Sequence, residues 1–407
     1  TMNNHIEQSL ADLRDRALRY ERPERYYNGE HDLKFATEKF ENTFGTLFRE
    51  FALNLCPVVC DAVRDKLRID SFGVMSTGVA ELGSDSSDSQ NSLTRQIWHR
   101  NRMATRAGEV HKEALKTGDA YLIVWPDDLG RACLYPNRAA NISVAYDEDS
   151  LGRIAYAAKA WRTSDKHVRL NLLYPDRIER YISKEKSEGA LPEAKEFEPL
   201  VGTRTLLSAA PGATERTGVS AFPNPYGVVP VFHFANNADL GTYGRSELEA
   251  AIPVQDGLNK SVLDMLVAME YSAFRQRWVA GIEVDYDAEG KAISPFKNGV
   301  DNLWVAGKDA RFGDFEAAQL DQFLRVKDSF RVDIASVTGT PLHYFLQQVG
   351  EFASGESLKQ SGTRFLAKVR DRQESFGQVW ADAMSFALRI EGNPGTQLLT
   401  NWEDPSP

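Results

Sequence analysis

The stretch SELEAAIPVQDGLNKSVLDMLVAMEY, residues 246–271, predicts the first of three long amphipathic helices in the last third of the chain. Its apolar residues recur at three- and four-residue steps, which places them on one helix face. Ser246 and Glu249 have the spacing of an N-terminal capping box. Because Pro253 cannot continue a preceding helical turn, the main helix is expected to open at Pro253, within an element spanning 246–276. Three charged residues fall on the face opposite the apolar stripe: Asp256, Lys260 and Asp264.

A return helix and a third, longer helix follow. The return helix is expected over 314–338 and ends at the sequence TGTP, where Gly339 can adopt the left-handed conformation and Pro341 cannot continue the helix. After an irregular segment at 339–355, the third helix is expected over 354–391, more than about 50 Å long at 1.5 Å per residue. Such a helix needs neighbours along its whole length, and copies of the same chain are the expected ones. The residues expected to pack between copies are Leu366, Val369, Phe376 and Trp380.

The first 245 residues divide into a helical block, 1–117, and a β-rich block, 118–245, so the predicted fold class is α+β. Helices are expected near 6–18 and 37–67, and a third helix should carry Leu93, Ile97 and Leu115. The polar segment 76–92 is expected to be an exposed loop, and 183–227 a surface excursion. Strands are expected at YLIVW (121–125), ISVAY (142–146), IAYAAKAW (154–161), VRLNLLY (168–174) and VPVFHF (229–234).

Composition and charge exclude several classes of protein. The chain has 407 residues, of which 42% are apolar and 26% charged, and its formal net charge is −10. Tight binding of DNA irrespective of sequence needs a basic face, so the acidic balance argues against a DNA clamp, although an ordinary acidic protein would show the same charge. No run approaches the roughly 20 apolar residues that a membrane span needs, and no signal peptide is evident. Three cysteines make a disulfide framework improbable.

Three groups of residues resemble known chemical sites. Cys56 and Cys60 share a helix face, but a metal site needs at least three protein ligands, so buried thiols are expected. His111 and Glu113 form the H-x-E of zinc deaminases without the matching P-C-x-x-C, and a solvated helix face is expected. The acidic segment 285–290 resembles a calcium loop whose twelfth position is Phe296, so a hairpin turn is the simpler interpretation.

No phosphate-binding loop of the type G-x-x-x-x-G-K-[ST] is present, so any ATPase that works with this chain must be another protein. The sequence therefore predicts a protein that is not an enzyme and holds no cofactor and no metal. The alternative is a soluble α+β metallohydrolase that uses His111 and Glu113 with cysteine ligands. The two hypotheses are separated by zinc content and by assembly size.

Five segments together resemble the portal proteins of tailed double-stranded DNA bacteriophages, specifically those of long-tailed siphophages. They are YYNGEHDLKFA (26–36), NLCPVVCDAVRDKLRIDSFG (54–73), YGRSELEAAIPVQDGLNKSVLDMLVAMEY (243–271), ASVTGTPLHYFL (335–346) and SGESLKQSGTRFLAKV (354–369). The resemblance implies a portal fold and a homo-oligomeric ring, typically a dodecamer, at one vertex of the virion capsid, assembled in the host cytoplasm. Its implied partners are the terminase motor, head-tail adaptor proteins, and major capsid and scaffolding proteins. Double-stranded DNA would pass through the ring during packaging and ejection without sequence-specific contacts.

The resemblance also implies a division of the chain. The wing would comprise 1–245 and the long helix 354–391, the stem 246–276 and 314–338, the clip 277–313, and the tunnel loop 339–355. Residues 392–407 would stand where such portals usually continue into a helical crown. The tunnel-loop residues expected to meet DNA are Gln347, Gln348, Val349, Gly350, Glu351 and Ser354.

Two further sets of site residues follow from this division. On the stem, Arg325, Lys327 and Arg331 are candidates for phosphate contact, and salt bridges between stems are the alternative because Asp321, Asp328 and Asp333 are interleaved with them. On the clip, the residues expected to bind partners are Trp278, Asp287, Gly290, Lys291 and Trp304. Large aromatics are enriched in protein contacts, and they could equally fill a small clip core.

Overall fold

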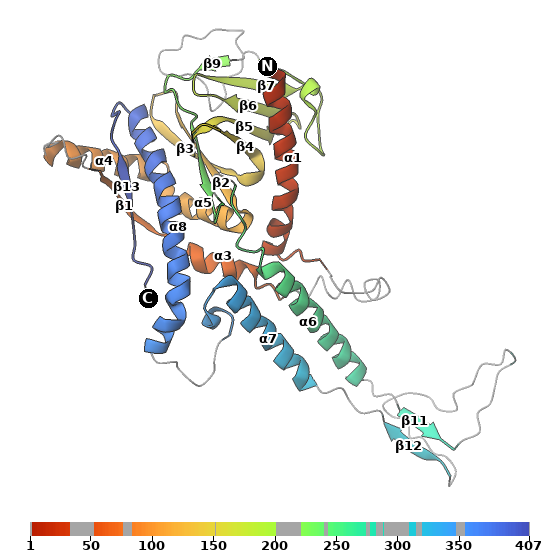
Figure 1. Ribbon diagram of the computed structural model, residues 1–407. Helices are drawn as coiled ribbons and strands as arrows, with labels where there is room; N and C mark the ends of the chain where they lie inside the picture. The colour runs from red at the N-terminus through yellow and green to blue at the C-terminus, as the bar shows by residue number, and fades with distance from the viewer. Residues whose placement is uncertain are drawn as a thin grey trace.

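The computed structural model describes residues 2–32, 53–75, 84–150, 152–200, 221–239, 243–273, 277–281, 288, 309–314, 320–346 and 355–406. A helix-and-sheet body carries a two-helix projection, at whose far end lies a small two-stranded antiparallel sheet (Figure 1). The α+β class predicted from the sequence is confirmed. None of the described helices combines the length and the apolar character that a membrane span requires.

The described helices fall into a body set and a projecting pair. The body helices are α1 (Met2–Tyr27), α3 (Cys56–Arg64), α4 (Ser84–Arg100), α5 (Met103–Thr117) and α8 (Gly355–Ile390). The projecting pair is α6 (Ala251–Ala273) and α7 (Leu320–Thr338), which lie side by side and are called the stem hairpin below (Figure 1).

The described strands form four antiparallel groups. The largest has the order β4 (Ile142–Tyr146), β5 (Ile154–Arg162), β6 (Val168–Leu173), β7 (Arg177–Ser183) and β8 (Phe197–Pro199), with β9 (Ala221–Pro223) also on β7. The second has the order β10 (Val231–Ala235), β2 (Asp119–Pro126) and β3 (Ala132–Arg138). The two pairs are β1 (Ile69–Val74) with β13 (Leu398–Trp402), and β11 (Arg277–Ala280) with β12 (Arg311–Asp314).

The main core lies between the long helix α8, the three-stranded sheet, and helices α3 and α5. Strand β2 is buried along its whole length because α5 and α8 pack against its sheet while the six-stranded sheet contributes a second core on the other side. Helix α1 packs its own stripe, which includes Leu10 and Leu13, against the six-stranded sheet. The stem hairpin therefore projects from a body that folds around its own cores.

Several predicted boundaries were wrong. The single helix expected from Leu93 to Leu115 is two helices, because Arg102 adopts a left-handed conformation with φ of 54° between α4 and α5. The loop expected at 76–92 is already helical from residue 84 onward. Helix α1 extends well beyond 6–18 and contains Pro23. Of the helix expected at 37–67, the structure describes α3, and residues 33–52 lie outside the described part.

The ends of the stem helices also differ from the prediction. Helix α6 begins at Ala251, two residues before Pro253. The first turn of a helix accommodates proline, because N–H groups there have no intrahelical acceptor and the missing N–H of proline breaks no hydrogen bond. Ser246 does not form the predicted box with Glu249. Instead its hydroxyl donates to the Lys116 carbonyl at 2.5 Å and accepts from the Leu248 amide at 3.0 Å. The return helix begins at Leu320 rather than near residue 314, which ends β12.

The segment after α8 forms a strand. Residues 398–402 pair with β1, more than 300 positions earlier in the sequence, so that Phe72 lies opposite Thr400. This strand was not predicted from the sequence, because its pairing depends on a partner strand that lies far away in the sequence. The predicted extent of the long helix, 354–391, is confirmed within one residue at each end.

Candidate functional site

The stem hairpin is held together by close packing of its two helices. Gly257 of α6 faces Phe330 of α7, and a Cβ at Gly257 would lie 2.8 Å from the Phe330 ring. Nearer the body, Ile334 and Ala335 of α7 are buried. Leu258 and Val262, which follow Gly257 along α6 as it leaves the body, are buried as well. The absence of a side chain at Gly257 is therefore what lets the aromatic ring sit between the helices.

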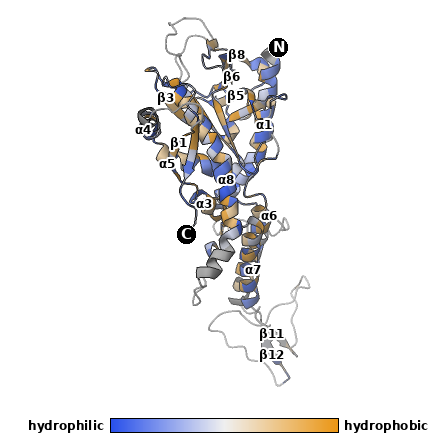
Figure 2. Ribbon diagram, turned by 60° about the vertical axis from the view of Figure 1, so that its left-hand side comes forward, coloured by the Kyte–Doolittle hydropathy of each residue, from blue (hydrophilic) through white to orange (hydrophobic). Residues whose placement is uncertain are grey.

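Apolar residues remain exposed on the other sides of α7. Leu324, Val326, Val332 and Val337 are each between 43% and 46% exposed. At 100° per residue, Leu324 and Val332 fall on one side of the line of Phe330 and Ile334, along which α7 packs inward, and Val326 and Val337 fall on the other side. Figure 2 shows hydrophobic and hydrophilic residues interspersed along this hairpin. Both flanks of the stem thus carry apolar surface that the chain itself leaves uncovered.

The three basic residues predicted on the stem do not share a face. Lys327 and Arg331 precede the buried residues Ile334 and Thr338 at helical steps, so they lie on the side of α7 that packs inward, and both are half-buried. Arg331 forms an ion pair with Asp328 at 3.3 Å. Arg325 is exposed on the outer side. Arg331 is thus paired within its own helix, and the predicted contact of the three cations with phosphate stays a prediction.

Buried polar side chains anchor the base of α6 to the body. Asp256 is only 4% exposed and accepts hydrogen bonds from the Tyr26 hydroxyl at 2.5 Å and from the Arg22 guanidinium at 3.3 Å. Burial is the main cause that raises the pKa of Tyr26, and the hydrogen bond to Asp256 is the second cause. The phenol therefore remains protonated and donates to the carboxylate. Helix α1 therefore fixes the orientation of the stem at its root.

A second anchor involves the amide of Gln255. Its oxygen accepts from the Leu55 amide at 2.9 Å, and its nitrogen donates to the Leu53 carbonyl at 2.8 Å and to Asn259 at 2.8 Å. The Asn259 amide in turn contacts His31 at 2.9 Å. Because unpaired buried amides are costly, these satisfied bonds specify one position of α6 against the segment leading into α3.

Glu247, in the turn before α6, joins the stem root to α8. Its carboxylate contacts Lys368 at 2.5 Å and Arg372 at 2.8 Å, and it also accepts from Asn236 at 3.1 Å. Burial alone would raise the pKa of Glu247, but the charges of Lys368 and Arg372 outweigh it and lower that pKa. Glu247 is thus an ionised carboxylate that links the turn before α6 to α8.

The other end of the stem is tied to the same helix. The Lys368 ammonium also donates to the Thr338 carbonyl at 3.0 Å, and the Arg364 guanidinium donates to the Ser336 carbonyl at 3.3 Å. Carbonyls in the last turn of a helix have no intrahelical donor and carry partial negative charge, so cations stabilise that end. Lys368 thereby links α8, the beginning of the stem and its end.

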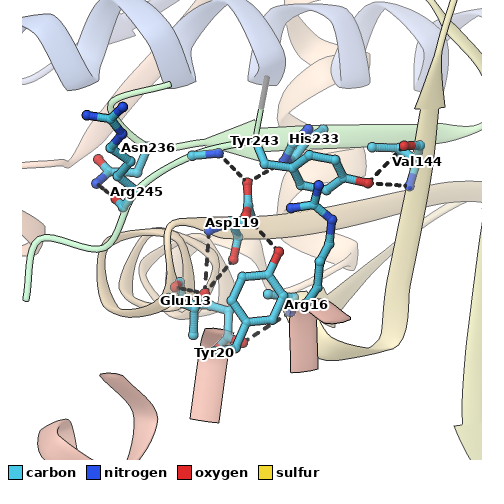
Figure 3. Close-up of polar contacts among 12 residues, drawn as sticks. Arg16, Tyr20, Glu113, Asp119, Val144, His233, Asn236, Tyr243 and Arg245 are labelled. Carbon is cyan, nitrogen blue, oxygen red and sulfur yellow. Dashed lines mark hydrogen bonds and ion pairs between the residues drawn. The ribbon is translucent and has the colours of Figure 1, made fainter. Parts of the chain in front are cut away.

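A buried polar cluster joins α1 to the two sheets (Figure 3). Asp119 at the start of β2 accepts from the Tyr20 hydroxyl at 2.7 Å and from the Gly244 amide at 2.8 Å, and it pairs with His233 Nε2 at 2.7 Å. His233 Nδ1 meets the Tyr146 hydroxyl at 2.5 Å. Asp119 is 1% exposed and His233 8%. The pair resembles an acid–base dyad, but it is sealed by the chain's own side chains and its role is structural.

The residues considered for metal chemistry are buried. His111 is fully buried rather than solvated as predicted, and its Nε2 accepts a hydrogen bond from the Trp380 indole at 2.8 Å. Desolvation lowers the pKa of His111 to about 3, so the imidazole is neutral. Glu113 pairs with Lys116 at 3.0 Å and accepts from the Ala139 amide. This arrangement removes the sequence basis for the metallohydrolase alternative.

The expected burial of the thiols of Cys56 and Cys60 is confirmed. Burial raises the pKa of Cys56 to about 12 and that of Cys60 well above its ordinary value, so neither is a ready thiolate ligand. In the described part of the chain, no group of three or more potential ligands could hold a metal ion.

The assignment of the long-helix stripe to contacts between subunits was wrong for three residues. Val369, Phe376 and Trp380 have no exposed surface in the single chain. Trp380 packs against Trp98 and Phe234 of the same chain. The stripe is buried internally because α8 crosses the three-stranded sheet. Leu366 is half-buried, and its predicted contact with another copy stays a prediction.

Most residues of the predicted tunnel loop and clip lie outside the described part. This applies to all six loop residues, Gln347, Gln348, Val349, Gly350, Glu351 and Ser354. It applies equally to the clip residues Asp287, Gly290, Lys291 and Trp304, and to the acidic segment around 285–290 except residue 288. The backbone of Trp278 lies in β11, opposite Gly313 of β12.

The residues that anchor the stem were not predicted from the sequence. Gln255 and Asp256 sit within an ordinary amphipathic pattern, and their partners come from segments some 200 positions away. The only local signal was the density of polar residues, including Asn259, between the apolar positions near the start of the helix.

A family model described as phage portal protein, SPP1 Gp6-like, matches residues 78–407, which is most of the chain. The chain belongs to this family. The portal protein of Mycobacterium phage L5 is 30% identical over 197 residues, which cover 45% of this chain and 40% of the relative. The portal protein of Mycobacterium phage D29 is 29% identical over 197 residues, with the same coverage. The chain thus matches about two-fifths of the length of these portal proteins.

Solved structures with a similar arrangement come from gene transfer agent (GTA) particles. A chain in the neck of an empty GTA particle, computed with C6 symmetry, is 12% identical with a TM-score of 0.46, and the match covers 85% of this chain and 79% of that one. A chain from the virion of the native GTA particle is 13% identical with a TM-score of 0.45 and the same coverage.

Proposed function

We propose that this portal-family chain forms a homo-oligomeric ring at one vertex of a phage capsid, and that double-stranded DNA passes through the ring. The observation that carries the proposal is the stem hairpin. Its two helices project from a body with internally buried cores, yet α7 leaves Leu324 and Val332 exposed on one flank and Val326 and Val337 on the other. A monomer gains nothing from two uncovered apolar flanks, whereas in a ring each stem has a neighbour on both sides.

The proposed parts are those of the family. The stem hairpin would surround the channel, and 277–313 would be the clip that docks the terminase motor and later the head-tail adaptor, through Trp278, Trp304 and the turn at 287–291. The loop at 339–355 would enter the channel. The polar anchors of α6 and the contacts of Lys368 support this arrangement, because both ends of the stem are then fixed to one rigid body.

The proposed role is mechanical. The ring, typically twelve subunits in such portals, would be a platform for capsid assembly, packaging and ejection, and the energy for packaging would come from a separate ATPase. On the stem, Arg325 is the one of the three candidate cations that is exposed and oriented to meet DNA or a neighbouring stem.

The first test removes the apolar flanks. Replacing Leu324 and Val326 by Asp places one charge on each flank of α7, and burying an unpaired charge costs several kcal/mol at every subunit contact. We expect the double variant to keep its helical circular dichroism and to form no rings under negative-stain microscopy. Ser329→Asp, which adds a charge to an exposed position of the same helix, should still form rings. Rings of normal size from the double variant would contradict the proposal.

A further inference from the structure

Three exposed arginines, called the arginine patch below, lie in the second half of α4, in the turn after it and in the first turn of α5. They are Arg95, Arg102 and Arg106, and the exposed His99 lies among them. From residue 90 to residue 108 the sequence contains four arginines and no carboxylate, within a chain of net charge −10. The patch is thus a local reversal of the charge of the molecule.

The patch is unpaired within the described chain. Arg100 forms an ion pair with Glu391, whereas no ion pair joins Arg95, Arg102 or Arg106 to another described residue. A shallow hollow on this face is lined by Ser92, Arg95, Gln96, His99 and Arg100. These side chains supply N–H and O–H donors, which suits an acceptor-rich, negatively charged ligand.

The turn within the patch is rigidly positioned. Asn101 donates to the carbonyls of Ile97 at 2.9 Å and Ala132 at 3.0 Å, and it accepts from the Leu134 amide at 3.0 Å. Arg102 is held in the left-handed conformation, which non-glycine residues adopt at a cost of roughly 1–2 kcal/mol. The surrounding structure therefore fixes a strained residue whose side chain faces solvent.

The chemistry of the patch favours a phosphate backbone over a protein surface. Protein interfaces have an apolar core, often aromatic, whereas Trp98, the aromatic residue of α4, is turned inward against Phe72 and Trp380. Contacts with nucleic-acid backbones instead use arginines whose planar guanidinium groups bind phosphate oxygens in pairs. Figure 1 shows α4 at one side of the body, away from the stem hairpin and from β11 and β12.

We propose that the arginine patch binds the phosphate backbone of duplex DNA at a surface of the body outside the channel. The choice of duplex DNA as ligand rests on the proposed function, since the DNA that fills the capsid is the polyanion available to this surface. Because the contacts are to phosphates, the binding is independent of sequence and weakens as salt rises.

The experiment measures binding of the assembled full-length protein to a fluorescein-labelled, 30-bp duplex of mixed sequence by fluorescence anisotropy between 50 and 200 mM salt. The patch variant is Arg95→Gln with Arg102→Gln and Arg106→Gln. The slope of log K against log salt is negative, and each lost phosphate contact reduces its magnitude by about 0.9. The magnitude should therefore fall by up to about 3, and the affinity at low salt by at least about tenfold. The matched control removes three scattered exposed cations, Arg68→Gln, Arg153→Gln and Lys186→Gln, and should keep most of the affinity.

Two outcomes would overturn the proposal. Equal duplex binding by the wild-type protein, the patch variant and the control would show that the patch does not contact DNA. Loss of binding to a labelled polyglutamate peptide, with duplex binding retained, would identify the patch as a docking surface for an acidic protein. Ring formation by the patch variant is scored by negative-stain microscopy. Loss of DNA binding by a variant that still forms rings would concern the patch alone, and not the stem contacts that the proposed function invokes.

Discussion

At the scale of single residues, a few buried charges connect elements that are distant in sequence. Glu247 contacts both Lys368 and Arg372, and Lys368 also caps the end of α7. The two cations overcome the desolvation of Glu247 and lower its pKa. A carboxyl whose pKa is lower in the folded than in the unfolded state stabilises the fold above the unfolded value, near 4.3, and this contribution is lost as the pH falls through the folded value.

We therefore expect Glu247→Gln to lower the free energy of unfolding by about 3 kcal/mol at pH 7, because two buried cations lose their partner. The difference from the wild-type protein should shrink as the pH falls below about 4. Asp371→Asn is the matched control, because Asp371 contacts the same Arg372 from a position that is 67% exposed and should contribute less than about 1 kcal/mol. Denaturant unfolding monitored by tryptophan fluorescence at pH 7 and pH 3.5 gives both values. Equal losses from the two variants would show that Glu247 does not link the turn before α6 to α8.

At the scale of elements, the sequence predicted what depends on local periodicity. The stem helices, the long helix and the five strand segments were all found, because each has a clear apolar repeat, although the predicted ends of the stem helices were wrong. The pairing of β1 with β13 was missed, since it joins residues more than 300 positions apart. The break at Arg102 was missed because a left-handed arginine gives no signal that glycine or proline would give.

The site was less predictable than the fold for the same reason. His111 was expected on a solvated face and Trp380 between subunits, yet the two side chains are hydrogen-bonded to each other inside one chain. A helical stripe shows that a face is buried, but it does not show whether the neighbour is the same chain or another copy. The polar anchors at Gln255 and Asp256 likewise depend on distant partners.

The stem hairpin offers a test at this scale. Gly257→Ala should gain up to about 1 kcal/mol from helix propensity, but its Cβ would lie 2.8 Å from Phe330, and overpacking typically costs about 1–3 kcal/mol. We expect a net loss of thermal stability and fewer rings. Gly362→Ala in α8 is the matched control, because a Cβ there meets no atom within 4 Å and should be neutral or stabilising. Adding Phe330→Leu should relieve the clash, and failure of this double variant to recover would place the strain elsewhere.

At the scale of the whole molecule, the structure separates a rigid body from the projection that the proposed function places around DNA. The segment 339–354 leaves the fixed end of the stem and leads into α8. Helix α7 ends at Thr338, whose carbonyl is bound by Lys368, and α8 begins at Gly355. A loop that starts at the fixed end of the stem is positioned to reach the channel of the proposed ring. The sequence places no Lys or Arg between Gly339 and Gly355, so such a loop would guide DNA by shape and weak polar contacts.

Changing the charge of this loop tests whether it meets DNA. Gln347→Lys with Gln348→Lys would add two positive charges per subunit, and with twelve subunits about two dozen around the channel, which strengthens phosphate attachment in a salt-dependent way. We expect DNA packaging to slow at low ionic strength and to recover as salt rises, because attachment resists the sliding of the duplex. Gln347→Glu with Gln348→Glu is the matched control and should show no such slowing at low salt. A lysine variant that packages at the wild-type rate across the whole salt range would show that the loop lies away from the duplex, and the channel would then be lined by the stem alone.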